Sequence, residues 1–417
     1  MKIALNTPIR KWLTAATVLP AVVYLGLAAR DFVASWLGGR PELQSLQRAA
    51  WLDPRNADYR NHVGRYYDLV ARDPLTAIRY YKQAVQLNPH SARYWFDLAG
   101  AYQILGDTEN QTAALERAIQ ADATTPDVAW EAANLYLVQG ENEKALREFR
   151  VVLANDAPFA SVAVNYCWRI SPDVDRMLAE VIPHTTDAEV TFLNFLQTKQ
   201  ETAATFKVWD ALMEIKQPFD RRMAYDYFQY LILHKEVDEA VLVWKETASR
   251  FGLSSYVPVG GNLVVNGTFN YDPLNAGLDW RYNKQPGVTL TLDPTDFHAG
   301  RRSLLINFDG PAITDAGIFE LIAVQPNTTY EFSGYYKNGE IEGAGGPHFT
   351  IQDMYSQAVY YESDELKDAG FWKSVTSEFT TGPDCKLVML HVRRLPAGSP
   401  IRGKLWIDDF RIARKPS

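Results

Sequence analysis

Apolar residues recur three and four positions apart through the first half of the chain. Two such stripes lie on either side of Gly106: Trp95, Leu98, Ala99 and Tyr102 before it, and Leu115, Ala118 and Ile119 after it. Spacings of three and four place side chains on one face of a helix, so each stripe predicts an amphipathic helix. Gly106 can adopt the left-handed backbone conformation that ends a helix. The segment is therefore predicted to be a pair of helices joined by a tight turn.

The same pattern returns at a fixed interval of 34 or 35 residues. Gly140 repeats the position of Gly106, and Ala49 marks a half-copy before the first full one. A fixed period of this length is typical of a stacked repeat architecture, in which each helix pair buries its apolar face against its neighbours. Two sets of equivalent residues show the interval. The first is Tyr67, Tyr102 and Tyr136, and the second is Ala84, Ala118 and Val152.

Residues 42–158 resemble the tetratricopeptide repeat family, with three well-marked units. Two features depart from the family pattern. One extra residue lies in the turn near Asp73-Pro74, and the second copy has Gln111 and Ala123 where a small residue and Pro are usual. The positions of the first unit that match the family are Gly64, Tyr67, Ala77, Tyr81, Ala84 and Pro89.

The resemblance implies a concave surface, formed by the first helix of each pair, that binds an extended peptide of a partner protein. Two of its aromatic residues have an alternative role, since Phe96 and Trp130 would instead pack against the helices that follow. The residues expected to line the groove by position are Asn61, Arg65, Phe96, Gln103, Trp130 and Asn134.

Residues 159–251 look like a degenerate continuation of the repeats. Apolar stripes at helical spacing persist, for example Ala240, Trp244 and Ala248, but the period is lost around Ser171-Pro172 and Ile182-Pro183. We expect further helix pairs here without a defined register.

The pattern changes after Phe251. Residues 252–261 are rich in Gly, Ser and Pro and predict a linker. Beyond the linker, apolar and polar residues alternate in short runs such as "VTLTLDP" and "KLVMLHVRR". Alternation with period two predicts strands, and several short strands in 262–414 predict an antiparallel β-sandwich. The chain is therefore expected to be multidomain, α then β.

The sandwich resembles the jelly-roll carbohydrate-binding modules of the galactose-binding-like class. The ordered segments that carry the resemblance are "NLVVNGTFNYDPLNAGLDWRY", "HAGRRSLLI", "IAVQPNTTYEFSGYYK", "FWKSVTSEFTT" and "KLWIDDFRI". The resemblance implies binding of a polysaccharide, and a sugar ring stacks on a flat aromatic side chain. The aromatic candidates for this contact are Trp280, Tyr282, Tyr336, Tyr355, Tyr361 and Trp372. Packing in the sandwich core is the alternative for each, and in the pairs Tyr335-Tyr336 and Tyr360-Tyr361 one ring must point inward.

The same resemblance implies a structural calcium site near the meeting of the first and last strands. Asn270 and Asp408 occupy the candidate positions. Asn270 stands where these modules have an acidic residue, which weakens the site because calcium requires several carboxylate oxygens. The alternative is that Asp408 and Asp409 belong to a turn or a solvated edge. Apart from this calcium, no cofactor is expected.

The N-terminus has the pattern of a membrane anchor. Residues 12–29 contain no charge, and Lys2, Arg10 and Lys11 precede them. An apolar stretch of this length can span a bilayer, and cations stay on the cytoplasmic side. We expect a cytoplasmic segment at 1–11, a single-pass anchor at 12–37 and an exported remainder. The alternatives are a cleaved signal peptide, with Gly26-Leu27-Ala28 near its cleavage site, and a helix of a soluble domain.

Charge and composition narrow the function. The net charge is −8 and no block of Lys or Arg occurs, which argues against nucleic-acid binding. Cys167 and Cys385 are expected to be buried thiols. No common catalytic motif is present. Glu362, Asp364 and Glu365 form a local acidic patch, and paired carboxylates can catalyse glycoside hydrolysis, but acidic patches in loops are common. No catalytic residue is therefore predicted.

Together these features predict a non-catalytic, membrane-tethered scaffold in envelope or extracellular polysaccharide assembly. Its repeats would recruit a protein and its sandwich would bind glycan. The alternatives are a carbohydrate-active enzyme with an acidic site in the sandwich, and a sandwich that only caps the repeats. The short linker contains Tyr256, Val257 and Pro258, which need cover, so we expect the sandwich to dock against the final helices.

Overall fold

The structure is a computed structural model that describes residues 7–155 and 157–416. It contains two compact units, Met1–Thr198 and Lys199–Ser417. Part of the expected cytoplasmic segment, including Lys2, lies outside the described residues. The first element is the long helix α1 (Pro8–Gly38), within which Thr14–Gly38 is long and apolar enough to cross a membrane. This span begins later and extends further than the uncharged stretch 12–29, and includes the ion pair of Arg30 with Asp31.

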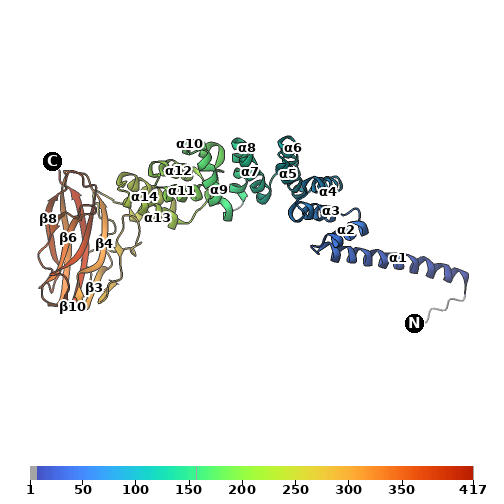
Figure 1. Cartoon of the computed structure of the whole chain (residues 1–417). Helices are drawn as coiled ribbons and strands as arrows, with labels where there is room; N and C mark the ends of the chain where they lie inside the picture. The colour runs from blue at the N-terminus through green and yellow to red at the C-terminus, as the bar shows by residue number, and fades with distance from the viewer. Residues whose placement is uncertain (1–6, 156, 417) are drawn as a thin grey trace. The chain divides into compact units, whose positions relative to one another are not determined.

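Helix pairs follow at the predicted interval (Figure 1). Each well-marked repeat contains two helices of similar length, separated by a turn of two or three residues. The helices of this region are α2 (Leu43–Leu52), α3 (Ala57–Arg65), α4 (Pro74–Leu87), α5 (Ala92–Leu105), α6 (Thr108–Ala121), α7 (Pro126–Gln139) and α8 (Asn142–Asn155).

The extra residue of the first repeat is accommodated in its first helix. A π-helical segment, η1 (Tyr66–Val70), continues α3, and the backbone N–H of Ala71 donates to the carbonyl of Tyr66. A π-helical turn takes in one more residue than an α-helical turn, so the inserted residue leaves the position of the next helix unchanged. That helix begins with Asp73, whose side chain accepts a hydrogen bond from Thr76 N, and with Pro74 in its first turn.

The predicted glycine turns have the expected conformation. Gly106 and Gly140 end α5 and α7 with φ of 71° and 77°. The equivalent turn of the first repeat contains Arg72 at φ 53°, although left-handed backbone favours glycine. Stacking of the helices therefore imposes this turn even where the sequence lacks glycine.

Helix pairs also continue through the degenerate region, as expected. The second helix of one pair is short and again partly π-helical, which explains why the period is lost between residues 171 and 183. The elements are α9 (Ala157–Ile170), α10 (Val174–Arg176), η2 (Met177–Val181), α11 (Thr186–Lys199), α12 (Thr202–Glu214), α13 (Arg221–Leu233) and α14 (Val237–Phe251).

Small residues set the distance between the paired helices. A side chain at Gly64 would place its Cβ 2.6 Å from the ring of Tyr81, and Ala99 and Ala133 are fully buried. Cβ contacts below 3 Å do not occur in well-packed interiors, so Gly64 is needed for the close approach of α3 and α4.

The second half of the chain is an antiparallel β-sandwich, preceded by the short 3-10 helix η3 (Ser254–Tyr256). One sheet has the strand order β1-β4-β9-β6-β7 and the other β2-β3-β10-β5-β8. The strands are β1 (Arg281–Tyr282), β2 (Val288–Asp293), β3 (Ser303–Ile313), β4 (Asp315–Ala323), β5 (Thr329–Gly343), β6 (Gly346–Asp353), β7 (Val359–Glu362), β8 (Lys373–Thr380), β9 (Leu387–Leu395) and β10 (Ser399–Arg414).

The first and last segments of the sandwich lie together, as expected. Leu263 N donates to the carbonyl of Ile412, and Phe410 N donates to that of Gly267. Phe410 lies in the sandwich core, where its ring packs on those of Trp280, Phe332 and Phe349. Cys167 and Cys385 are free, buried thiols, as predicted.

The last helices and the sandwich belong to one compact unit. The side chain of Lys386 pairs with Asp238 at the start of α14, and the hydroxyl of Tyr355 donates to the carbonyl of Ile232 in α13. Ile322 points into the sandwich core, so its neighbour Leu321 points outward, and Leu321 is nevertheless buried beside α14. The expected docking of the sandwich against the final helices is therefore present.

Candidate functional site

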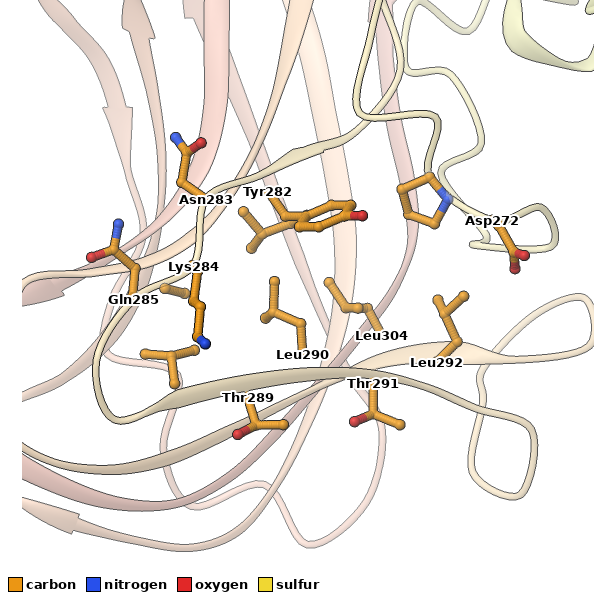
Figure 2. Close-up of a pocket in the computed structure, with 14 residues that line it drawn as sticks. Asp272, Tyr282, Asn283, Lys284, Gln285, Thr289, Leu290, Thr291, Leu292 and Leu304 are labelled. Atoms are coloured by element: carbon orange, nitrogen blue, oxygen red, sulfur yellow. The ribbon is translucent and has the colours of Figure 1, made fainter.

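A cleft of about 660 Å³ opens at one edge of the sandwich, between the loop that follows β1 and the edge strand β2 (Figure 2). Backbone hydrogen bonds hold the loop in place. Tyr282 N donates to the side chain of Asn275, Asn283 N to the carbonyl of Gly317, and Asp309 N to that of Gly287. The cleft is thus built on strand ends whose positions are set by the two sheets.

The cleft has an apolar floor and a polar rim. Leu290 and Leu292 point into it from β2, while Thr289 and Thr291 point to the opposite side of the strand (Figure 2). The ring of Tyr282 lies above the leucines and is 47% exposed. The polar residues at the cleft are Asp272, Asn283, Lys284 and Gln285.

This combination suits a sugar ring. The C–H faces of a sugar are apolar and pack on an aromatic ring, and its hydroxyls require hydrogen-bond donors and acceptors at the edges. Tyr282 supplies the ring, and Asn283 and Gln285 each offer both a donor and an acceptor. The volume also falls in the usual range of ligand pockets, roughly 300–1,000 Å³.

The other predicted sugar contacts do not join Tyr282. Trp280 is fully buried against Phe269 and Phe410, with ring centroids 4.9 and 5.2 Å away, so its prediction as a sugar contact is wrong. The prediction of Tyr336 as a sugar contact is wrong for the same reason, since Tyr336 is 8% exposed and its ring packs on that of Phe349. Alternation along β5 turns Tyr336 inward and its neighbour outward.

The remaining three candidates have structural partners. Tyr361 packs on Phe332 at the border of the core. Tyr355 is engaged with α13 through its hydroxyl. Trp372 directly precedes β8, and its indole N–H donates to Asp296 at 3.1 Å. Tyr282 is thus the one residue of the predicted set that lines the cleft.

Buried charges lie next to the helix–sandwich junction. Asp279 is fully buried, and loss of hydration raises its carboxyl pKa to about 7. Two residues away, burial lowers the pKa of Arg281 to about 10. The guanidinium of Arg281 donates to the side chain of Gln229 in α13 and to the carbonyl of Gly277. Arg281 therefore connects the sandwich to the helices.

The residues expected to hold calcium do not fit that ion. Asp408 accepts hydrogen bonds from the backbone N–H groups of His298, Ala299 and Asp409, and burial raises its pKa to about 6. The side-chain oxygen of Asn270 accepts from Arg301 N. These side-chain oxygens thus accept hydrogen bonds from backbone N–H groups instead of coordinating a cation.

A permanent cation also lies close by. The guanidinium of Arg302 donates to the carbonyl of Phe269 at 2.6 Å and to Asp272 at 2.7 Å. Within residues 7–155 and 157–416, no group of three or more His, Cys, Asp and Glu side chains could hold a metal ion. The donor set that calcium requires is therefore not assembled around Asn270 and Asp408.

The repeat groove contains a polar cluster. The amide of Asn61 donates to Asp97 at 2.8 Å, and burial raises the pKa of the Asp97 carboxyl, while Arg65 acts in the opposite direction. Burial and the neighbouring Asp97 also raise the pKa of Glu131. Asn61 and Arg65 thus belong to a charged cluster whose acidic members were missed. The sequence contains a signal for these two acidic residues, because Asp97 and Glu131 lie one repeat of 34 residues apart.

The two aromatic groove residues are not free for a peptide. Phe96 is 3% exposed, so it is not available to a peptide. The ring of Trp130 lies 5.3–5.9 Å from those of Phe149, Phe159 and Tyr166, on the helices that follow. The groove prediction is therefore wrong for both. Gln103 is half-buried, and Asn134 donates to the carbonyl of Trp130 in its own helix.

Family comparisons agree with this architecture. Residues 261–394 match the model of a carbohydrate binding domain, and residues 92–125 match that of a tetratricopeptide repeat. A search of curated proteins finds no match. The chain therefore joins a tetratricopeptide repeat array to a sandwich of the carbohydrate-binding type.

Similar solved structures cover one half of the chain at a time. A CBM4 structure is 16% identical with a TM-score of 0.29, covering 36% of this chain and 99% of its own. The CBM22-1 xylan-binding domain of Paenibacillus barcinonensis Xyn10C is 16% identical with a TM-score of 0.26, covering 36% and 93%. MamA is 20% identical with a TM-score of 0.24, covering 41% and 85%.

Proposed function

We propose that this protein is a non-catalytic scaffold that holds a glycan in the Tyr282 cleft and a protein partner on its repeats. The observation that carries the proposal is the exposed ring of Tyr282 above an aliphatic floor, in a sandwich that matches a carbohydrate binding domain. A glycan would stack on this ring and hydrogen-bond to the amides and charges at the rim. A role in envelope or extracellular polysaccharide assembly would follow.

The partner on the repeats would contact the charged cluster of the groove. Arg65, Asp97 and Glu131 lie on successive first helices and offer charges of both signs. An extended peptide with alternating charges matches such a surface, because each of its charges would meet an opposite one. Charge reversal at the exposed Glu131 should therefore weaken capture of the partner without unfolding the array.

We further propose that α1 anchors the protein in a membrane with the remaining chain exported. The support is the apolar span Thr14–Gly38, preceded in the sequence by Arg10 and Lys11. A C-terminal alkaline phosphatase fusion should be active, and an N-terminal tag should stay on the full-length chain. An inactive fusion would contradict the orientation, and loss of the tag would indicate a cleaved signal peptide.

Retention of polysaccharides by the full chain, immobilised in neutral detergent, tests the glycan proposal. Tyr282→Ala should weaken retention about tenfold or more, equivalent to about 1.4 kcal/mol. Tyr271→Ala is the matched control, because Tyr271 is 48% exposed and does not line the cleft. Equal losses in both variants, or no loss in either, would exclude the cleft.

The same samples test the absence of catalysis. Incubation of a retained polysaccharide with the protein should release no new reducing ends. If reducing ends appear, and if they disappear when Glu362 or Asp364 is changed to the amide, the protein is an enzyme with an acidic site. In that case binding and turnover would both have to be assigned to the sandwich.

A further inference from the structure

A second cleft, also of about 660 Å³, lies inside the unit that contains the last helices and the sandwich. We call it the α14 groove. One wall is a single face of α14, because Val237, Val241 and Trp244 are spaced by four and three residues. The linker residues Val257 and Pro258 also border the groove. The opposite wall comes from the sandwich: Leu263, Leu278, Leu321, Ala323 and Val324.

Contacts at two places along α14 attach the helix beside the groove. Near the start of the helix, Asp238 pairs with Lys386 at 2.5 Å. Six residues later than Asp238, the indole N–H of Trp244 donates to the carbonyl of Tyr256 at 2.7 Å. Six residues span about 9 Å of helix. The helix is therefore fixed to the sandwich and to the linker, and the space between these contacts is not filled by side chains.

The charges around the groove are mainly positive. Lys245, Lys386 and Arg414 border it, whereas Asp238 is the one carboxylate among the residues that line it, and it pairs with Lys386. Lys245 and Arg414 are exposed. This local excess of cations contrasts with the net charge of −8 for the whole chain. An anionic group at the mouth of the groove would meet two cations that Asp238 does not neutralise.

The apolar walls indicate the remainder of the ligand. Most of the wall consists of valine, leucine, alanine and tryptophan, which offer no hydrogen bonds to sugar hydroxyls apart from the indole N–H already engaged by Tyr256. Gln325 and Tyr330 are the uncharged polar residues that line it. Apolar walls of this kind instead favour burial of a hydrocarbon chain, at about 25 cal/mol per Å² removed from water. The α14 groove and the Tyr282 cleft both have apolar walls, and the α14 groove differs in the three cations at its border.

We propose that the α14 groove binds an amphiphile with one hydrocarbon chain and an anionic head. The chain lies between α14 and the sandwich, and the head lies near Lys245 and Arg414. A lipid phosphate and a fatty acid share this chemistry, and the experiment below separates them. The proposal does not depend on glycan binding or on the partner of the repeats.

Photo-crosslinking of the full chain in dodecyl maltoside tests this assignment. The probe is dodecyl phosphate with a diazirine at the end of its chain. The detergent has the same C12 chain with a neutral head, so labelling above its background requires the phosphate. Adducts are expected on peptides from α14 (Val237–Phe251) and β4 (Asp315–Ala323). Labelling confined to α1 would overturn the proposal, because it would reflect only the micelle.

Competition and two variants complete the test. Unlabelled dodecyl phosphate should abolish the adducts, and inorganic phosphate should not, since it lacks the chain. Equal competition by dodecanoate assigns the site to any anionic amphiphile, and no competition assigns it to phosphates. Ala323→Trp should fill the groove and remove labelling, whereas Ala358→Trp, at an exposed position outside it, should not.

The charge-reversed variant Lys245→Glu with Arg414→Glu should weaken labelling about tenfold or more, equivalent to about 1.4 kcal/mol. Both side chains are exposed, so this variant keeps the fold. Unchanged labelling in it would overturn the role of the anionic head, and unchanged labelling in Ala323→Trp would place the chain elsewhere.

Discussion

The contact of Gly277 with Trp244 makes the docking of the sandwich on the last helix measurable. Gly277 has φ of 62°, and a Cβ added there would lie 2.3–2.4 Å from three atoms of the Trp244 ring. Trp244 is fully buried and its indole N–H donates to the linker, so a shift of the ring toward the α14 groove would break this hydrogen bond. Gly277→Ala should therefore push α14 away from the sandwich.

The size of the effect has two parts. A non-glycine residue in left-handed backbone costs about 1 kcal/mol, and overpacking of a buried contact costs about 1–3 kcal/mol. Gly260→Ala is the matched control, because Gly260 also has φ of 62° and an added Cβ there meets no atom within 4 Å. The control has only the backbone cost, so the difference between the variants, about 1–3 kcal/mol, measures the contact alone.

Differential scanning calorimetry of the full chain provides the measurement. The unit Lys199–Ser417 has a size for which 1 kcal/mol lowers the melting temperature by about 2–4 °C. Gly277→Ala should therefore melt about 2–12 °C below Gly260→Ala. Hydrogen exchange of peptides from α14 and β4, followed in the same samples, should identify the affected transition by faster exchange in both elements.

Equal melting temperatures for the two variants would refute the reasoning. That result would mean that Trp244 does not pack against Gly277 and that the sandwich is not docked on α14. Faster exchange in α14 without a change in β4 would also contradict docking, because the two elements would then open independently.

The remaining predictions concern pH, packing and metal. The pKa of Asp279 is raised to about 7 by burial, so the folded state binds the extra proton and stability falls as pH rises from about 4 to 7. Asp279→Asn should remove the part of this fall that is due to Asp279, about 4 kcal/mol, in urea titrations at pH 4 and pH 8, and the raised pKa values of Asp408 and Glu320 account for the remainder. Trp130→Ala should destabilise the repeats by about 3–5 kcal/mol, measured by chemical denaturation. A loss below about 1 kcal/mol would contradict the packing role and support the groove prediction for Trp130. EDTA should leave the melting temperature unchanged, since the oxygens of Asn270 and Asp408 serve N–H donors; a fall restored by calcium would reinstate the metal site.

Much of the repeat array could be predicted because its information is local. The interval of 34 residues, the glycine turns and the small residues at helix contacts each follow from the chemistry of one repeat and return in the next. The structure confirms the helix pairs and adds that η1 takes in the extra residue near Asp73. Sequence spacing predicts the insertion but not the π-helical turn, because several turn geometries can absorb one residue.

In the sandwich, the local sequence pattern does not determine which side chains are buried. Alternation along β5 indicates that one of Tyr335 and Tyr336 is buried, but it does not say which one. The choice depends on which face of the strand meets the other sheet, and that follows only from pairing with β8 and β10. The structure turns Tyr336 inward and stacks Tyr335 on His298.

The candidate sites depend on the tertiary structure still more. The Tyr282 cleft combines residues from 272 to 318, and the α14 groove combines residues from 237 to 414. The sequence by itself determined that helix pairs precede a sandwich and that the linker needs cover. Which aromatic ring stays exposed, and which cations surround an apolar groove, was decided by packing, because these properties belong to surfaces assembled from segments far apart in the chain.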